Sequence, residues 1–321
     1  MSFFSVVVVV RCVGTVLEPS GSTVSAGHFH SCALRQKDGT YFGGIPTCWG
    51  YDGQGQSSFA PGEVVFVQLS AGHLHTCGLG VDELVRCWGR IGSSFVSKTK
   101  FSSVSSGEFH ACGVAKAGGV LCWGEDHKTG ATKPPLSKKA LLVAAGKDFS
   151  CLLSADDGRG IECWGDDSRS QRNAPEGSFA LVAASTSSPH ACGLTARTFD
   201  LRCWGGALEI YDESVRRRHR DQNRTLGSPA PNYAPPFLEG PFTQLGLGYR
   251  TTCVIATSQL RCFGLLAHLL TGSQLADKSL NFQQVSVGRD HICALTDQGL
   301  LLCVGQPTAS AAHVPPGFQA A

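Results

Sequence analysis

The sequence lacks the features that mark several classes of protein. Its charges nearly cancel, with 27 Lys and Arg residues against 25 Asp and Glu. This balance argues against a globally basic nucleic-acid binder and against a disordered chain, so nucleic acid is not an expected partner. No run reaches the roughly 18 consecutive apolar residues that a spanning helix needs, so we expect no membrane insertion within this chain.

Motifs for catalysis and metal binding are also missing. No Cys-x-x-Cys occurs, which argues against a zinc ribbon or a thioredoxin-like site. His219-Arg220-Asp221 has the letters of a kinase catalytic loop, but the glycine-rich loop, the strand lysine motif and Asp-Phe-Gly are absent. No nucleophile, base and orienting acid recur together. We therefore predict that the protein is not an enzyme and has no catalytic, cofactor or metal site.

The sequence is instead built from one repeated unit, which is most complete at residues 67–89. In this copy Val67, Leu69 and Ala71 alternate with polar residues, and this period of two predicts a half-buried strand. A glycine turn, a second strand, a short loop and a third strand then follow. Each unit is thus expected to form a small antiparallel sheet.

The unit recurs, and seven copies carry one cysteine in the second strand and one in the third. In the copy at 67–89, Cys77 and Cys87 lie almost symmetrically about the hairpin loop, at the separation that a disulfide needs. The pairs are Cys32 with Cys48, Cys77 with Cys87, Cys112 with Cys122, Cys151 with Cys163, Cys192 with Cys203, Cys253 with Cys262, and Cys293 with Cys303. Cys12 is left over. Disulfides indicate an oxidising compartment, whereas the alternative is that each cysteine is a small buried apolar residue.

The spacing of the repeats predicts the fold. The first cysteines of the pairs are 45, 35, 39, 41, 61 and 40 residues apart. A period of about 40 residues made of short strands predicts an all-β protein, a seven-bladed β-propeller with one hairpin disulfide per blade. One closed propeller uses nearly the whole chain, so we expect residues 1–321 to form a single domain.

Two segments depart from the repeat. Residues 1–19 are either a half-repeat, because 6–14 resemble a third strand, or a degenerate signal segment, because 3–10 form a short apolar run. We favour the half-repeat, which would close the ring together with the C-terminal segment. Residues 206–241 form a basic and proline-rich insertion, which we expect to be an exposed loop.

The insertion carries two candidate sites. Asn223 begins a glycosylation sequon, so the protein is a candidate glycoprotein. Arg216, Arg217, Arg218 and Arg220 form a basic cluster that is a candidate partner contact. The alternative is a solvated loop without a partner.

Two residue types recur at a fixed position of the repeat, each in five of the seven copies. The histidines are His30, His75, His110, His190 and His291, and the tryptophans are Trp49, Trp88, Trp123, Trp164 and Trp204. One histidine per blade does not converge as metal ligands do, so we expect structural histidines bonded to neighbouring backbone. The tryptophans are expected to pack between blades.

The motif resembles that of a known family. Gly72-His73-Leu74-His75-Thr76, together with Trp49-Gly50 followed by Gly55-Gln56, is similar to the regulator of chromosome condensation repeat, which forms seven-bladed propellers. The resemblance covers nearly all of residues 20–305. Its cysteine-paired form resembles the extracellular members, which include secreted bacterial repeat proteins and the ectodomains of plant crinkly-type receptor kinases. The resemblance implies protein–protein binding through the propeller loops. Nuclear members also bind chromatin and catalyse nucleotide exchange on a small GTPase, but the loops here match no motif for that activity.

We therefore predict a non-enzymatic, secreted or cell-surface propeller that binds an unknown protein partner through its blade loops. One alternative is an intracellular regulator, nuclear or cytoplasmic, acting as a nucleotide-exchange factor or a chromatin scaffold with reduced cysteines. Another is the ectodomain of a receptor kinase whose other domains are outside this chain. The sequence leaves open which partner binds and which face of the propeller it uses.

Overall fold

The computed structural model describes residues 23–35, 43–58, 64–91, 95–136, 138–206, 238–306, 309–316 and 318. These residues form 21 strands, β1 to β21, and short 3-10 helices. Blades 1 to 3 comprise β1 (Val24–Ala26), β2 (His30–Arg35), β3 (Ile45–Gly50), β4 (Phe66–Ala71), β5 (His75–Gly80), β6 (Leu84–Gly89), β7 (Phe95–Ser106), β8 (His110–Ala115) and β9 (Val120–Gly124). Blades 4 and 5 comprise β10 (Ala140–Ala145), β11 (Phe149–Ser154), β12 (Ile161–Gly165), β13 (Phe179–Ala184), β14 (His190–Thr195) and β15 (Leu201–Gly205). Blades 6 and 7 comprise β16 (Gln244–Gly248), β17 (Thr251–Ala256), β18 (Gln259–Gly264), β19 (Phe282–Val287), β20 (His291–Thr296) and β21 (Leu301–Gly305), with helices η2 (Ala267–Leu270), η3 (Gln274–Ala276) and η4 (Ser310–Ala312).

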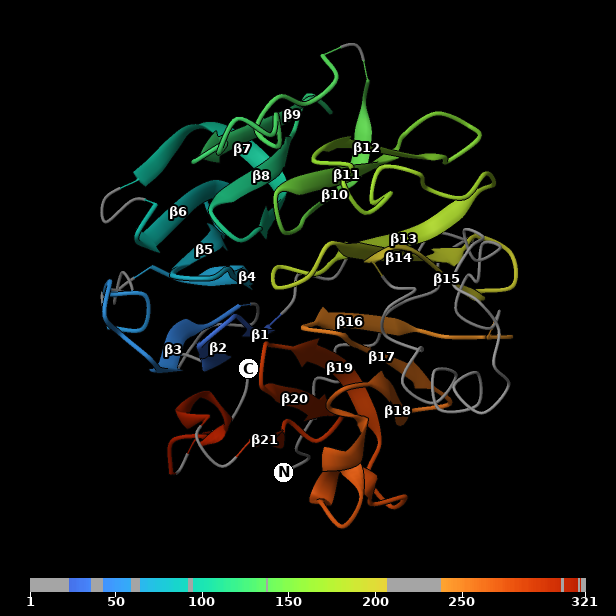
Figure 1. Cartoon of the computed structure of the whole chain (residues 1–321). Helices are drawn as coiled ribbons and strands as arrows, with labels where there is room; N and C mark the ends of the chain where they lie inside the picture. The colour runs from blue at the N-terminus through green and yellow to red at the C-terminus, as the bar shows by residue number, and fades with distance from the viewer. Residues whose placement is uncertain are drawn as a thin grey trace, which may run out of the picture.

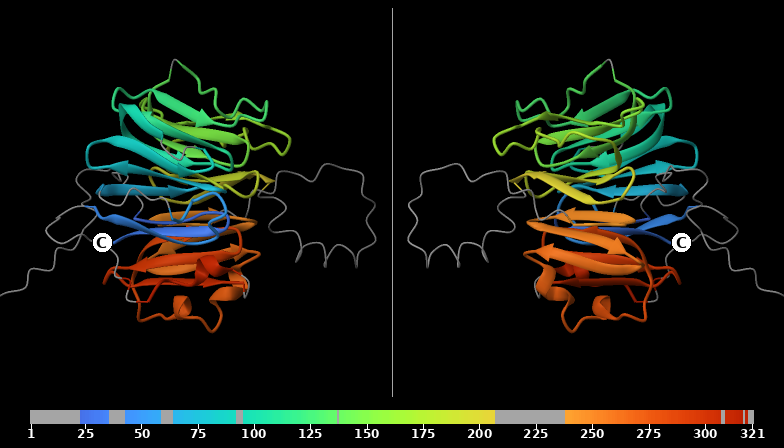
Figure 2. Two further views of the ribbon diagram at one scale, coloured as in Figure 1. Left: turned by 90° about the vertical axis from the view of Figure 1, so that its left-hand side faces the viewer. Right: turned by 90° about the vertical axis from the view of Figure 1, so that its right-hand side faces the viewer.

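Each blade is an antiparallel sheet of three consecutive strands, and the blades stand around a ring (Figure 1). The first strand of each blade lies nearest the ring axis, and the side views show the blades stacked with their faces toward one another (Figure 2). β1 lies beside β19 and β20, so blade 1 closes the ring against blade 7. The expected seven-bladed propeller is confirmed.

The connection between blades 2 and 3 is itself a strand. β7 pairs with β6 through Cys87 and Phe95 and then with β8 through Phe101 and Ala115, which joins both blades in one six-stranded sheet. Residues 95–101 contain neither glycine nor proline, so nothing in them interrupts an extended chain. The first half of β7 thus gives blade 2 a fourth strand.

The regular alternation expected at Val67, Leu69 and Ala71 is wrong at its first member. A β-bulge between Phe66 and Gln68 shifts the register of β4 against β5. Val67 consequently packs on the core between blades 2 and 3, whereas Leu69 packs on the core between blades 1 and 2. An extra residue in one strand reverses the faces on its two sides, and this bulge is not visible in the alternation of residue types.

The hydrophobic core lies between the blades. Each cluster joins two neighbours, as where Cys112 and Val114 of blade 3 pack with Val143 and Leu152 of blade 4. Trp49 of blade 1 lies in a cluster with residues of blade 7, which buries the closing contact of the ring. Because a blade is covered on both faces, all six residues of β5 are buried, and the same holds for β8.

Several expectations fall on residues that the structure does not describe. These are the segment 1–19, residues 207–237 of the insertion, the sequon at Asn223, and the cluster Arg216, Arg217, Arg218 and Arg220. They stay predictions. Among the described residues, no helix is long and apolar enough to cross a membrane.

Candidate functional site

The seven cysteine pairs form disulfides, one in each blade. Cys77 of β5 lies directly opposite Cys87 of β6, and their Cα atoms are 4.0 Å apart. Each link joins the second and third strands of its blade and closes a loop of 9 to 16 residues. In the loop-entropy model each such link stabilises the fold by about 2–3 kcal/mol.

Three of the recurring histidines, His30, His110 and His291, join neighbouring blades through hydrogen bonds. His30 Nε2 lies 2.7 Å from Thr76 Oγ1 in the next blade, and His110 Nε2 lies 2.8 Å from Ser150 Oγ. Thr76 Oγ1 donates to the carbonyl of Gln56, so the imidazole must donate its Nε2 proton to the hydroxyl. The expectation of a direct bond to neighbouring backbone is wrong for these histidines, because a hydroxyl stands between the ring and the carbonyl.

The tryptophans attach the crossing segments to the blades. The indole of Trp88 donates to the carbonyl of Gln56, which lies in the crossing from blade 1 to blade 2, at 2.9 Å. Trp49, Trp164 and Trp204 make the corresponding bonds to carbonyls of the crossings before their own blades. The expected packing between blades is confirmed, because Trp88 shares a core cluster with Cys32 and Leu34 of blade 1.

This constant scaffold presents a set of varied side chains at one end of the ring, which we call the platform. Each blade contributes an inner and a middle residue from the turn between its first two strands, and an outer residue directly after its third strand. The inner residues are His28, His73, Glu108, Lys147, Ser187, Tyr249 and Arg289. The middle residues are Phe29, Leu74, Phe109, Asp148, Pro189, Arg250 and Asp290, and the outer residues are Tyr51, Arg90, Glu125, Asp166, Gly206, Leu265 and Gln306.

Backbone hydrogen bonds fix the platform in every blade. The amide of each outer residue donates to the carbonyl of the middle residue of its own blade at 2.7–2.9 Å, as Tyr51 does to Phe29. The turn begins with a glycine in most blades, because space is short there. A Cβ on Gly72 would lie 2.3 Å from His75 Cε1 and 2.5 Å from the carbonyl oxygen of Gly107. The side chains of the platform can therefore vary while the backbone beneath them stays in place.

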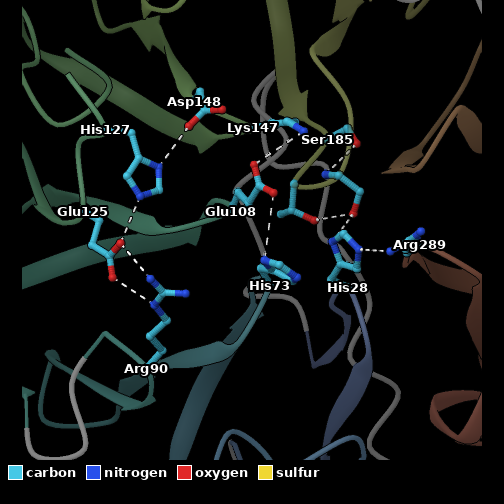
Figure 3. A network of polar contacts seen from close by, with 12 residues as sticks. His28, His73, Arg90, Glu108, Glu125, His127, Lys147, Asp148, Ser185 and Arg289 are labelled. Atoms are coloured by element: carbon cyan, nitrogen blue, oxygen red, sulfur yellow. Dashed lines mark hydrogen bonds and ion pairs between the residues drawn. The ribbon is translucent and has the colours of Figure 1, made fainter. Parts of the chain in front are cut away.

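Inner residues from several blades meet near the axis of the ring, in a region that we call the mouth (Figure 3). His28 of blade 1 reaches across the ring axis, where its Nδ1 lies 3.4 Å from Ser187 Oγ of blade 5. Arg289 donates to His28 Nε2 at 3.0 Å, so Nδ1 carries the imidazole proton and donates to Ser187. The ring of His73 packs on that of His28 with centroids 4.1 Å apart. Side chains from blades on opposite sides of the ring are therefore in contact at this end.

Charge is distributed unevenly around the mouth. Burial, together with the smaller effects of the nearby Arg289 and Lys147, lowers the pKa of His28 to about 3 and that of His73 to about 4. Both imidazoles are thus neutral at neutral pH. Burial raises the pKa of Glu108, whose carboxylate oxygens lie 3.9 Å from His73 Nδ1 and 3.9 Å from Lys147 Nζ. The mouth thus combines two buried neutral imidazoles with the charges of Glu108 and Lys147, which lie too far apart for a direct hydrogen bond.

A second polar group spans blades 2 to 4 (Figure 3). The Arg90 guanidinium donates two hydrogen bonds to the Glu125 carboxylate at 2.9 and 3.0 Å, and it lies over the Phe109 ring, 5.0 Å from the centroid. His127 extends the chain, with Nε2 3.0 Å from Glu125 and Nδ1 3.6 Å from Asp148. The hydrogen bonds from Arg90 lower the pKa of Glu125. In this part of the platform, charged side chains are therefore held in place by ion pairs beside the Phe109 ring.

A pocket of about 540 Å³ opens on the platform where blades 7, 1 and 2 meet. Its lining includes the middle residues Phe29, Leu74 and Asp290 and the outer residue Tyr51. Tyr51 is 51% exposed, which is high for so large an aromatic residue. In the part of the chain that the structure describes, no three His, Cys, Asp or Glu side chains are grouped to hold a metal.

Sequence reasoning missed the platform. In the motif Gly-x-x-His, as at 72–75, the glycine and the histidine are the residues that recur and that identify the repeat. The two variable residues between them are the inner and middle residues of the platform. The signal was present as variation inside an otherwise fixed pattern, combined with the geometry of a ring that brings one turn from every blade to the same end.

Comparisons with known proteins agree with this architecture. The family model for the regulator of chromosome condensation (RCC1) repeat matches residues 101–128 and 282–309. The ectodomain of the receptor kinase CR4 from Physcomitrella patens is 23% identical with a TM-score of 0.67, over 89% of this chain and 74% of that chain. The CRINKLY WD40 ectodomain of the Arabidopsis thaliana receptor kinase ACR4 is 22% identical with a TM-score of 0.66, over 94% of this chain and 99% of that one. Yeast RCC1 (Prp20), in a structure bound to Kap60, is 15% identical with a TM-score of 0.58, over 80% of this chain and 74% of that chain. Two segments of the chain therefore match the RCC1 repeat, and the chain has an RCC1-like propeller fold.

Proposed function

We propose that this chain is a non-enzymatic propeller, secreted or on a cell surface, that binds a partner protein on the platform. The observation that carries the proposal is the contrast between a repeated scaffold and varied side chains at one end of it. The same backbone hydrogen bond fixes the platform in all seven blades, while the residues displayed include His, Glu, Lys, Tyr and Arg. A recognition surface with a pre-organised backbone loses little conformational entropy when it binds.

The composition of the platform fits a protein ligand. Aromatic residues and arginines are enriched where proteins bind one another, and both gather here. Arg289 lies over the rings of Phe29 and Tyr249, and Arg90 lies over Phe109. These stacked pairs hold long side chains in defined positions, ready for contact with a partner.

The disulfides support an extracellular location. Intracellular reducing systems keep most cytosolic thiols reduced, so a link in every blade favours an oxidising compartment. The likeness in fold to two receptor-kinase ectodomains points the same way and keeps open that the chain is itself such an ectodomain. The RCC1 repeat match favours the second candidate, an intracellular regulator that binds a small GTPase or chromatin.

A photo-crosslinking experiment tests the platform as the binding face. Tyr51 on the platform and Val81 in the hairpin loop of blade 2 are similarly exposed, at 51% and 56%, and lie at opposite ends of the ring. Each is replaced in turn by p-benzoylphenylalanine, and the protein is irradiated with intact cells and medium of the producing organism. We expect a discrete crosslinked protein from position 51 and none from position 81. A crosslink from position 81 alone would show that the opposite face binds.

A further inference from the structure

The pocket beside Tyr51 has a mostly apolar lining with one charged side chain. Its lining has one carboxylate, Asp290, together with the rings of Phe29 and Tyr51 and the apolar side chain of Leu74. The two histidines that also line it, His28 and His73, are neutral at neutral pH because burial lowers the pKa of both. The pocket therefore offers aromatic and aliphatic walls, with the Asp290 carboxylate at one edge and the Arg289 guanidinium over the Phe29 ring.

The platform already contains a filled site with the same components. Over Phe109, the Arg90 guanidinium stacks on an aromatic ring while it donates two hydrogen bonds to the Glu125 carboxylate. A guanidinium suits such a place because its planar surface packs on a ring while its edge donates to a carboxylate. The pair Phe109 and Glu125 thus shows that an aromatic ring beside a carboxylate can bind a guanidinium on this platform.

Asp290 retains capacity for a second cation. Its own neighbour Arg289 approaches only to 3.6 Å between Nε and Oδ2, which is longer than a hydrogen bond. Arg289 also donates to His28 and lies over the rings of Phe29 and Tyr249. The side chain of Asp290 is 39% exposed, so its carboxylate can be reached from the pocket. Tyr51 packs edge-on to Phe29 with centroids 6.1 Å apart and adds a second aromatic wall.

We infer that this pocket receives an arginine side chain of the partner protein, with the guanidinium against Tyr51 and hydrogen-bonded to Asp290. The aliphatic part of that side chain would lie along Leu74 and Phe29. The inference rests on the proposed function, because it names the residue type that the partner presents to one part of the platform.

A titration with a defined probe tests the inference. The probe is N-acetyl-arginine N-methylamide, added to the complete disulfide-bonded protein, and the readout is the Tyr51 ring resonance in NMR spectra, identified with the variant Tyr51→Phe. We expect a saturable shift of this resonance. The citrulline analogue has the same shape but no charge, so it should produce no saturable shift.

Two matched variants locate the contact. Asp290→Asn keeps the shape of the side chain and should weaken binding of the arginine probe by about tenfold, as expected on loss of a charged hydrogen-bond partner. Asp297→Asn changes a carboxylate next to the far end of the same blade and should leave binding unchanged. An unchanged thermal midpoint in both variants confirms that they are folded.

The outcomes separate this inference from the proposed function. No saturable shift, an equal shift with the citrulline analogue, or full binding by Asp290→Asn would each overturn the arginine pocket. A crosslink from position 51 would still support the platform in that case. Absence of that crosslink, with a crosslink from position 81, would instead remove the platform and the pocket inference that rests on it.

Discussion

His30 and Thr76 lie 46 residues apart in sequence and join blade 1 to blade 2 by a hydrogen bond of 2.7 Å between Nε2 and Oγ1. Both side chains are fully buried. Thr76 Oγ1 donates a hydrogen bond to the carbonyl of Gln56, which also accepts a hydrogen bond from the indole of Trp88. One small network therefore connects a blade, its neighbour and the crossing between them.

Replacing Thr76 by valine tests the contribution of this network to stability. The variant Thr76→Val keeps the shape of the side chain but leaves the buried Nε2 proton of His30 without an acceptor. We expect the free energy of unfolding to fall by about 1–3 kcal/mol, measured by urea denaturation with the disulfides intact. An unchanged free energy would show that the bond contributes nothing.

The equivalent position in blade 3 offers the reverse experiment. There Ala111 stands where Thr76 and Ser150 stand in other blades, and His75 Nε2 is buried without a hydrogen-bond partner. The variant Ala111→Ser should supply the missing hydroxyl and raise the free energy of unfolding by about 0.5–1.5 kcal/mol.

Ala191 provides the control for that gain. It occupies the same position in blade 5, but the preceding blade has Phe149 in place of the histidine. Both alanines are fully buried. Ala191→Ser should therefore give no gain in stability. Equal effects of serine at 111 and 191 would contradict a specific pairing with His75.

The buried histidines predict that acid weakens the fold before most carboxylates titrate. Burial lowers the pKa of His30 and His190 to about 3, below the ordinary value of 6.5. Between these values the unfolded chain binds more protons, so stability is full above pH 6.5 and is lost as the pH falls toward 3. Each histidine contributes a slope of up to about 1.4 kcal/mol per pH unit. Urea unfolding should give a lower free energy at pH 5 than at pH 7.

His75 allows the source of that slope to be checked. Burial lowers its pKa well below the ordinary value, and its Nε2 has no hydrogen-bond partner to lose. His75→Phe copies the residue that blade 4 has at this position, Phe149. We expect the difference in unfolding free energy between pH 7 and pH 5 to shrink. A difference equal to that of the wild type would assign the acid sensitivity to other groups.

Removal of one hairpin disulfide should destabilise the protein by a definite amount. Replacing both Cys77 and Cys87 by alanine opens a link with a sequence separation of 10 residues. The free energy of unfolding should fall by about 2–3 kcal/mol. The same change at Cys151 and Cys163, with a separation of 12, should cost nearly as much. A loss at one blade only would indicate that local strain, not loop closure, sets the effect.

The repeat made the blades and disulfides predictable, because both follow from local spacing. Cys77 and Cys87 belong to one hairpin, so their pairing needs no knowledge of the rest of the chain. The partner of His30 was not predictable in the same way, since Thr76 comes from another copy of the repeat. The bulge at Phe66 and the strand character of 95–101 were missed because both depend on how neighbouring strands meet. The platform required the ring itself, which brings His28 and Ser187 together from blades 1 and 5.

A free-thiol count with non-reducing peptide mapping, on protein purified from its natural source, tests the extracellular disulfide-linked propeller most directly. Of 15 cysteines, 14 are paired in the structure, and only Cys12 lies outside these links. We expect at most one free thiol, with links such as Cys77–Cys87 and Cys112–Cys122 recovered as cross-linked peptides. Fifteen free thiols would contradict the extracellular assignment and favour the intracellular regulator, to be tested against small GTPases and nucleosomes.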